Sequence, residues 1–246
     1  YERRLALWLL ANFVYYNEHE VKHLCKMMYH EFVHRMLIDE YKNKMNIKDT
    51  LASILNSSRF YHLGKAGESG AYILYYFRHE NVLSLDLFLD RPEKLTPSVN
   101  KLVFIDDVTI SGKQAQKYFD SERETSKYDT DRQKILLTLI STEDAVKLLK
   151  ESKIEVISCI TLEERSKCFS RKSSIFKESK THLSNCKKFA KAYGRQLCPS
   201  HPLGYKNGEY TFGFYYNTPD NTLPIFWAHK PGWSPIMQRH DKLEGS

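Results

Sequence analysis

Residues 102–114 read LVFIDDVTISGKQ, and this stretch decides the fold class of the chain. Four apolar residues at 102–105 stand between polar flanks, which is typical of a buried central strand in a parallel sheet. Two adjacent carboxylates, Asp106 and Asp107, follow this strand, and a short loop then opens a helix-like segment over residues 113–123. Ligands of open parallel sheets bind at the carboxyl ends of the strands. The stretch therefore predicts a ligand site at the end of a buried strand.

The loop after the carboxylates has the composition of an anion site. Backbone N–H groups at a helix N-terminus bind anions, and a glycine at position 112 lets the backbone approach the ligand closely. The predicted phosphate-binding residues are Thr109, Ile110, Ser111, Gly112, Lys113 and Gln114. Two acids beside a phosphate make chemical sense if they accept hydrogen bonds from sugar hydroxyls or hold Mg²⁺, directly or through water. A strand that simply ends in a solvated acidic pair is the alternative interpretation.

The surrounding pattern predicts an α/β protein with a mainly parallel sheet flanked by helices. We expect strands at residues 71–78, 81–90, 134–140 and 154–162, and short strands at 210–216 and 223–227. Helices are expected at residues 142–152, with a cap at Ser141 or Thr142 followed by Glu143, and at residues 179–193. Alternation of strands and helices with short connections indicates parallel strands joined by right-handed crossovers.

The first 57 residues have the periodicity of helices and predict a helical extension. In residues 18–46 one stripe of a helix is apolar, and it consists of Val21, Cys25, Met28, Phe32 and Met36. Residues 58–240 would form the α/β domain, and residues 243–246 (LEGS) are interpreted as a vector tail. The N-terminal helices could serve for oligomerisation or for docking to a partner.

Two HExxH patterns, at residues 19–23 and 30–34, offer a competing interpretation as a zinc protease. Their four histidines, His19, His23, His30 and His34, lie opposite the apolar stripe by helical angle, so we expect them to be exposed. Lys22 and Arg35 add charge to a face that would have to line a catalytic cleft. The sequence identifies no third ligand for such a metal.

Composition limits the remaining classes. The 246 residues carry a net charge of +7, with a pI near 9.0, which fits either contact with nucleic acid or general solubility. Five widely spaced cysteines without a CxxC pattern fit a reducing cytosol, so a cytoplasmic location is expected. No apolar run approaches the roughly 20 residues that span a bilayer, so no membrane association is expected. Neither GxxxxGKS/T nor GxGxxG is present, which argues against a P-loop or a dinucleotide fold.

The strand, the acid pair and the loop resemble the type I phosphoribosyltransferases. Ile105-Asp106-Asp107-Val108 and Ser111-Gly112 match the fingerprint of this family, whereas Lys113 and Gln114 stand where small residues and Thr are usual. The resemblance implies that Asp106 and Asp107 are the catalytic pair and that they bind phosphoribosyl pyrophosphate, or a related nucleotide, together with Mg²⁺. It also implies that the earlier stretch Gly64, Lys65, Ala66, Gly67 and Ser69 holds the pyrophosphate, although an ordinary turn would have the same composition.

Near the C-terminus, HPLGY at residues 201–205 and NTPDNTLPIFW at residues 217–227 narrow the resemblance. They are similar to phosphoribosyltransferase-like domains encoded in bacterial anti-phage systems, retrons among them. This implies a defence effector that transfers or cleaves at the ribose anomeric carbon, with a defence-system protein as partner. The alternative is a non-catalytic module that senses a nucleotide or a nucleic acid. Asn217, Thr218, Asn221 and Trp227 could contact a base or form a lid, or they could be turn residues and a core tryptophan.

Overall fold

The computed structural model describes residues 1–40, 47–64, 68–88, 95–125, 132–177, 179–237 and 239. The chain divides into two compact units. One unit, Lys22–Thr161, contains the acid pair and is called the sheet unit below. The other, called the terminal unit, combines Tyr1–Val21 with Leu162–Ser246. This division differs from the predicted boundary at residue 58, because the first helix groups with the C-terminal part of the chain.

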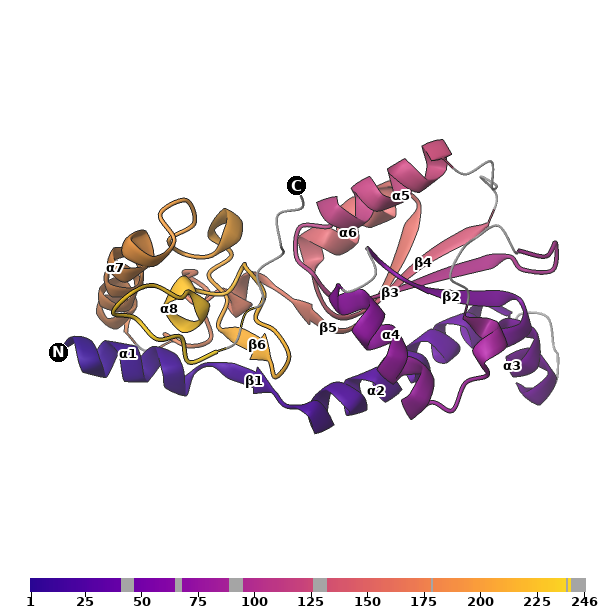
Figure 1. Cartoon of the computed structure of the whole chain (residues 1–246), viewed down its shortest axis with the longest axis horizontal. Helices are drawn as coiled ribbons and strands as arrows, with labels where there is room; N and C mark the ends of the chain where they lie inside the picture. Colours follow the sequence, from indigo (N-terminus) through magenta and orange to yellow (C-terminus); the bar gives the residue numbers. More distant parts are fainter. Residues whose placement is uncertain are drawn as a thin grey trace. The chain divides into compact units, whose positions relative to one another are not determined.

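The sheet unit is built on four strands in the order β2-β3-β4-β5 (Figure 1). The strands are β2 (Ser58–His62), β3 (Lys101–Thr109), β4 (Gln133–Thr142) and β5 (Ile154–Leu162). β2, β3 and β4 run parallel, with Phe60 paired with Val103 and Val103 paired with Ile135. The strands predicted at 102–105, 134–140 and 154–162 are therefore present, and the prediction of an α/β fold with a mainly parallel sheet is confirmed.

Helices cover both faces of this sheet (Figure 1). α2 (Glu18–Glu40), α3 (Ile47–Asn56) and α4 (Ser69–Glu80) lie on one face, and α5 (Lys113–Thr125) and α6 (Glu143–Glu151) lie on the other. Neighbouring residues of β2 pack on opposite faces of the sheet, because successive side chains of a strand point in opposite directions. The ring of Phe60 contacts Phe32 of α2 and Phe77 of α4, at centroid distances of 5.6 and 5.3 Å. Tyr61 instead belongs to the core under α5 and α6.

The apolar stripe predicted for α2 is confirmed. Its five residues are buried, namely Val21, Cys25, Met28, Phe32 and Met36. The histidines of the two HExxH patterns are exposed, as their helical angle predicts: His19, His23, His30 and His34.

Two expected strands are wrong. Residues 71–78 lie within α4, where Gly70, Ile73 and Phe77 are buried at helical spacing. Their aromatic content suggested a strand, but burial follows the helical period. Residues 81–88 contain a turn and the short 3-10 helix η2 (Leu85–Leu87), and the remaining two residues of the predicted strand lie outside the described residues. Leu85 is 66% exposed, so the alternating pattern does not mark a buried face.

The terminal unit brings the two ends of the chain together. α1 (Glu2–Ala11) packs on α7 (Lys180–Leu197), and β1 (Val14–Tyr16) pairs in parallel with β6 (Phe212–Phe214). Short 3-10 helices, η4 (Glu164–Ser166) and η5 (Tyr205–Asn207), lie in the connections. The strand expected at 223–227 is wrong, because α8 (Pro224–Trp227) forms there with a proline at the start, where helices tolerate it. Within the described residues, no helix combines the length and the apolarity needed to cross a membrane.

Replacing Phe32 by Ala should lower the free energy of unfolding of the sheet unit by about 3–5 kcal/mol, because a fully buried ring is lost. Chemical denaturation followed by circular dichroism measures this loss. His34→Ala, two residues further along the same helix but exposed, should change the free energy by less than about 0.5 kcal/mol. Equal effects of the two substitutions would contradict the packing of α2.

Candidate functional site

The candidate site lies where β3 extends beyond the end of its neighbour β2. The pairing of β2 with β3 ends at His62 and Ile105, whereas β3 and β4 remain paired from Asp106 with Thr138 to Thr109 with Ser141. Beyond Ile105 the chain after β2 leaves the strand direction. The Leu63 N–H still donates to the Ile105 carbonyl at 2.8 Å, and α4 begins six residues later. The acid pair therefore lies within β3, at the carboxyl edge of parallel strands, and not just after the strand as predicted.

Both carboxylates accept hydrogen bonds from nearby backbone. Asp106 Oδ1 accepts from the Asp107 N–H at 2.9 Å, and Asp107 Oδ1 accepts from the Val108 N–H at 2.8 Å. Asp107 Oδ1 also accepts from the Ser69 hydroxyl at 2.9 Å. Asp107 is 8% exposed, and Asp106 is only partly buried. These bonds fix the orientation of the pair and connect Asp107 to the first residue of α4.

The predicted phosphate loop leads from the end of β3 into α5. Thr109 is buried, Ile110 and Ser111 are partly buried, and the side chains of Lys113 and Gln114 are exposed. Gly112 has a φ of +66°, and a Cβ there would lie 3.2 Å from Leu148 and 3.3 Å from Ala145 of α6. α5 begins at Lys113, so the backbone N–H groups of its first turn lack helical partners and are suited to an anion.

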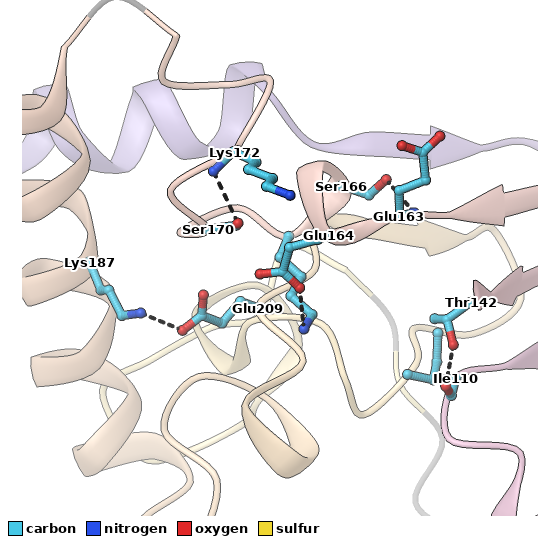
Figure 2. Close-up of polar contacts among 10 residues, drawn as sticks. Ile110, Thr142, Glu163, Glu164, Ser166, Ser170, Lys172, Lys187 and Glu209 are labelled. Carbon is cyan, nitrogen blue, oxygen red and sulfur yellow. Dashed lines mark hydrogen bonds and ion pairs between the residues drawn. The ribbon is translucent and has the colours of Figure 1, made fainter. Parts of the chain in front are cut away.

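Thr142 joins this loop to α6. Its hydroxyl donates to the Ile110 carbonyl at 2.6 Å and accepts from the Ala145 N–H at 3.1 Å, so it also caps α6 (Figure 2). The sequence predicted the cap but not the bond to the loop. Thr138, also on β4, donates to the Asp107 carbonyl at 3.0 Å. Two threonines of β4 therefore donate hydrogen bonds to backbone carbonyls at the end of β3 and in the loop that follows it.

Ser141 is a buried polar residue of β4 that the sequence did not single out as a ligand. It pairs with Thr109, it has no exposed surface, and its hydroxyl has no hydrogen-bond partner in the described part of the chain. Buried polar groups normally have hydrogen-bond partners, so a group without one calls for a structural or functional explanation. Its position opposite Thr109 makes Ser141 a further polar neighbour of the phosphate loop.

Part of the predicted pyrophosphate loop can be placed. Gly64 has a φ of +90°, which favours glycine, and Ser69 donates to Asp107 as described above. Lys65, Ala66 and Gly67 lie outside the described residues. Gly70, which was not among the predicted ligands, is required by packing. A Cβ there would lie 2.5 Å from the Leu63 carbonyl and 3.0 Å from the Ile105 carbonyl.

The residues predicted to contact a base or form a lid belong to the terminal unit. Asn221 is buried and donates to the Tyr205 carbonyl at 3.0 Å, and the Trp227 indole donates to the Thr222 carbonyl at 2.8 Å. The Arg239 guanidinium lies over the Trp227 ring, 4.8 Å from its centroid. Thr218 is buried and Asn217 is partly buried. Within the terminal unit, Asn221 and Trp227 thus have structural contacts.

The donor set of the acid pair fits Mg²⁺ bound together with a ligand. Magnesium is usually held by one or two carboxylates, with substrate phosphates and water completing its shell. Asp106 and Asp107 would supply the carboxylates. No group of three or more His, Cys, Asp or Glu among the described residues is arranged to hold a metal by itself. Phosphate and water oxygens would therefore have to complete the coordination.

The thiols of Cys25, which is buried, and Cys159, which is partly buried, are unsuited to nucleophilic chemistry at neutral pH. Burial is the main cause that raises the pKa of Cys159 to about 12, and burial likewise raises the pKa of Cys25. Only the thiolate is a strong nucleophile, so both side chains remain in the unreactive form. The acid pair and the loop are therefore better candidates for chemistry in this unit.

The chain is similar to a protein family and to a solved structure. The PRTase-CE family model matches residues 1–239. The crystal structure of orotate phosphoribosyltransferase from Aeropyrum pernix is similar over 45% of this chain and 62% of that chain, with 18% identity and a TM-score of 0.30. This chain thus covers less than two thirds of that protein. No curated protein matches the sequence.

The matched family and the parallel sheet define a phosphoribosyltransferase-like domain. Since the family model covers nearly all of the sequence, the chain belongs to the PRTase-CE family.

Replacing Thr142 by Val should lower the free energy of unfolding of the sheet unit by about 1–3 kcal/mol, because α6 loses its cap and the Ile110 carbonyl loses its donor. Thr142→Ser retains the hydroxyl and should lose less than about 1 kcal/mol, mainly from the missing methyl group. Urea denaturation of both variants measures the difference. A loss in Ser with none in Val would show that the methyl group, and not the hydrogen bonds, stabilises this contact.

Proposed function

We propose that the sheet unit binds phosphoribosyl pyrophosphate, or a related nucleotide, with Mg²⁺ and transfers or cleaves at the ribose anomeric carbon. One observation carries the proposal. A buried strand places Asp106 and Asp107 at the open carboxyl edge of the sheet, and a loop with Gly112 at positive φ leads directly into the N-terminus of α5. Membership of the PRTase-CE family supports the same class of chemistry.

The residues present suggest a division of roles. Asp106 and Asp107 would hold the ribose hydroxyls, directly or through Mg²⁺, which supplies charge neutralisation for the phosphates when it is bound. The backbone of residues 110–113 would bind the 5′-phosphate. The stretch from Gly64 to Ser69 would hold the pyrophosphate through backbone amides and the Lys65 ammonium.

In the reaction, the bond between the anomeric carbon and the pyrophosphate oxygen breaks, and a bond to the acceptor or to a water oxygen forms. The attacking N–H or O–H group releases its proton to solvent. The bonding electron pair leaves with the pyrophosphate, and positive charge develops on the ribosyl centre. Fixed hydrogen bonds at Asp107, from Ser69 and from Val108, would orient the carboxylate before the reaction. Such pre-orientation accelerates the reaction because the carboxylate does not have to reorient when the transition state forms.

A second candidate function is a ligand-sensing module without catalysis. It is favoured by Lys113 and Gln114, whose long exposed side chains stand where small residues are usual for the resembled family. Pyrophosphate release from phosphoribosyl pyrophosphate, measured with a panel of acceptors and with water alone, distinguishes the two functions. A sensor would bind the ligand and release none.

The defence role is a proposal that rests on the resemblance of residues 201–205 and 217–227 to domains of anti-phage systems. A defence effector of this kind would act in the bacterial cytoplasm, with a protein partner from the same system. Protection of the host from phage would then depend on Asp106 and Asp107.

A thermal-shift titration tests ligand binding. Phosphoribosyl pyrophosphate at about 100 times its dissociation constant should stabilise the protein by about 2.7 kcal/mol, which raises Tm by a few degrees. The shift should require Mg²⁺ and should disappear in Asp106→Asn/Asp107→Asn.

A matched control is Asp120→Asn/Glu151→Gln, which removes two exposed carboxylates from the same unit. This variant should keep the whole shift, because it changes net charge equally but leaves the candidate site intact. The absence of any shift in the unmodified protein at millimolar ligand would overturn the proposal, and so would an equal loss of the shift in both variants.

A further inference from the structure

The positive charge of the chain is concentrated around α7. Between residues 165 and 195 the sequence contains ten Lys or Arg residues and one acid, Glu178, so the net charge of this segment is +9. The whole chain has a net charge of +7, so the rest is close to neutral and slightly acidic. A basic balance that comes from one segment indicates an anionic partner more strongly than an even distribution would.

Within α7 the cations form one stripe. At about 100° per residue, five cations fall within an arc of about 100°. They are Lys180, Lys187, Lys188, Lys191 and Arg195. The stripe is about 22 Å long, from the rise of 1.5 Å per residue over fifteen residues. No acidic residue lies on α7 to neutralise it.

One cation of the stripe has an internal partner. Lys187 Nζ lies 2.7 Å from Glu209 Oε1, and Glu209 is buried and accepts from the Cys168 N–H through its carbonyl (Figure 2). In the described part of the chain, no carboxylate pairs with the four others, which are exposed: Lys180, Lys188, Lys191 and Arg195. Four cations thus remain available on a helix whose position in the terminal unit is fixed by packing.

The opposite face of α7 packs in the core of the terminal unit. Cys186, Phe189, Ala190 and Gly194 are buried in the terminal unit. The exposed residues of this helix include no large apolar side chain that could enter a lipid bilayer, as membrane-surface helices require. Lysine is also depleted at protein–protein interfaces. A long stripe of mainly lysine therefore fits neither of those partners as well as it fits a chain of phosphates.

We infer that the stripe Lys180, Lys188, Lys191 and Arg195 binds the phosphate backbone of a nucleic acid without reading its sequence. In duplex DNA each strand carries one phosphate per about 3.4 Å of axis, so the stripe could face about six phosphates of one strand. Phosphate contacts position a protein on nucleic acid, whereas base contacts specify the sequence. The surface uses other residues than the proposed phosphoribosyl site, so the two proposals stand or fall separately.

Fluorescence anisotropy of the whole chain with labelled oligonucleotides tests the inference. Four phosphate contacts on a duplex of about 20 base pairs predict a slope of log K against log salt of about −3.6. Affinity should then fall by about 100-fold between about 50 and 200 mM salt. In Lys188→Gln/Lys191→Gln/Arg195→Gln the slope should flatten to about −0.9, and the same change in salt should weaken binding by only about fourfold. Single-stranded DNA and RNA of equal length establish which form is preferred.

Lys147→Gln/Lys150→Gln/Lys153→Gln is the matched control, because it removes three exposed lysines from the sheet unit. It should bind as the unmodified protein does, and so should the charge-preserving Lys188→Arg/Lys191→Arg variant, which also guards against a folding defect. The inference is overturned if no nucleic acid binds at low salt, or if both glutamine variants weaken binding equally. Binding to phosphatidylserine vesicles in place of oligonucleotides would also overturn it.

Discussion

The unequal length of β2 and β3 is the constraint on which the candidate site depends. β2 stops pairing at Ile105, while β3 continues beside β4 as far as Thr109. The chain after β2 must therefore turn away sharply, while the Leu63 N–H still donates a hydrogen bond to the Ile105 carbonyl. The turn leaves no room for a side chain at Gly70, where a Cβ would lie 2.5 Å from the Leu63 carbonyl. As a result α4 begins beside β3, and its first residue, Ser69, bonds to Asp107.

The opposite side of the site is held by β4 and α6. Thr142 connects the Ile110 carbonyl to the first turn of α6, and Gly112 allows α6 to approach the loop closely. The loop backbone is thus fixed by contacts that do not involve its own side chains. This explains how Lys113 and Gln114 can stand at the start of α5 without disturbing the geometry that we propose for phosphate binding. The fold of the loop therefore does not depend on the side chains of Lys113 and Gln114, whereas catalysis could.

The sequence predicted those features that depend on local pattern. The stripe of α2, the buried strand before Asp106 and the Thr142 cap all follow from periodicity or capping. The strand predicted at residues 71–78 is wrong because this segment is rich in tyrosine, which favours strands. The segment is a helix, and its buried positions, Gly70, Ile73 and Phe77, are set by packing on the sheet. The bonds from Ser69 to Asp107 and from Thr142 to Ile110 span more than thirty residues, so no local pattern could reveal them. The pairing of β1 with β6 is a similar case, because it joins segments nearly 200 residues apart.

A crystal structure with phosphoribosyl pyrophosphate and Mn²⁺ in place of Mg²⁺ tests the central claim most directly. The account predicts the 5′-phosphate on the backbone N–H groups of residues 110–113. It also predicts an anomalous peak from Mn²⁺ beside Asp106 and Asp107, either coordinated directly or bridged by water. Ligand and metal bound elsewhere would contradict the account. An ordered loop that stays free of ligand at millimolar concentration would do the same, because the loop would then have kept its shape for another purpose.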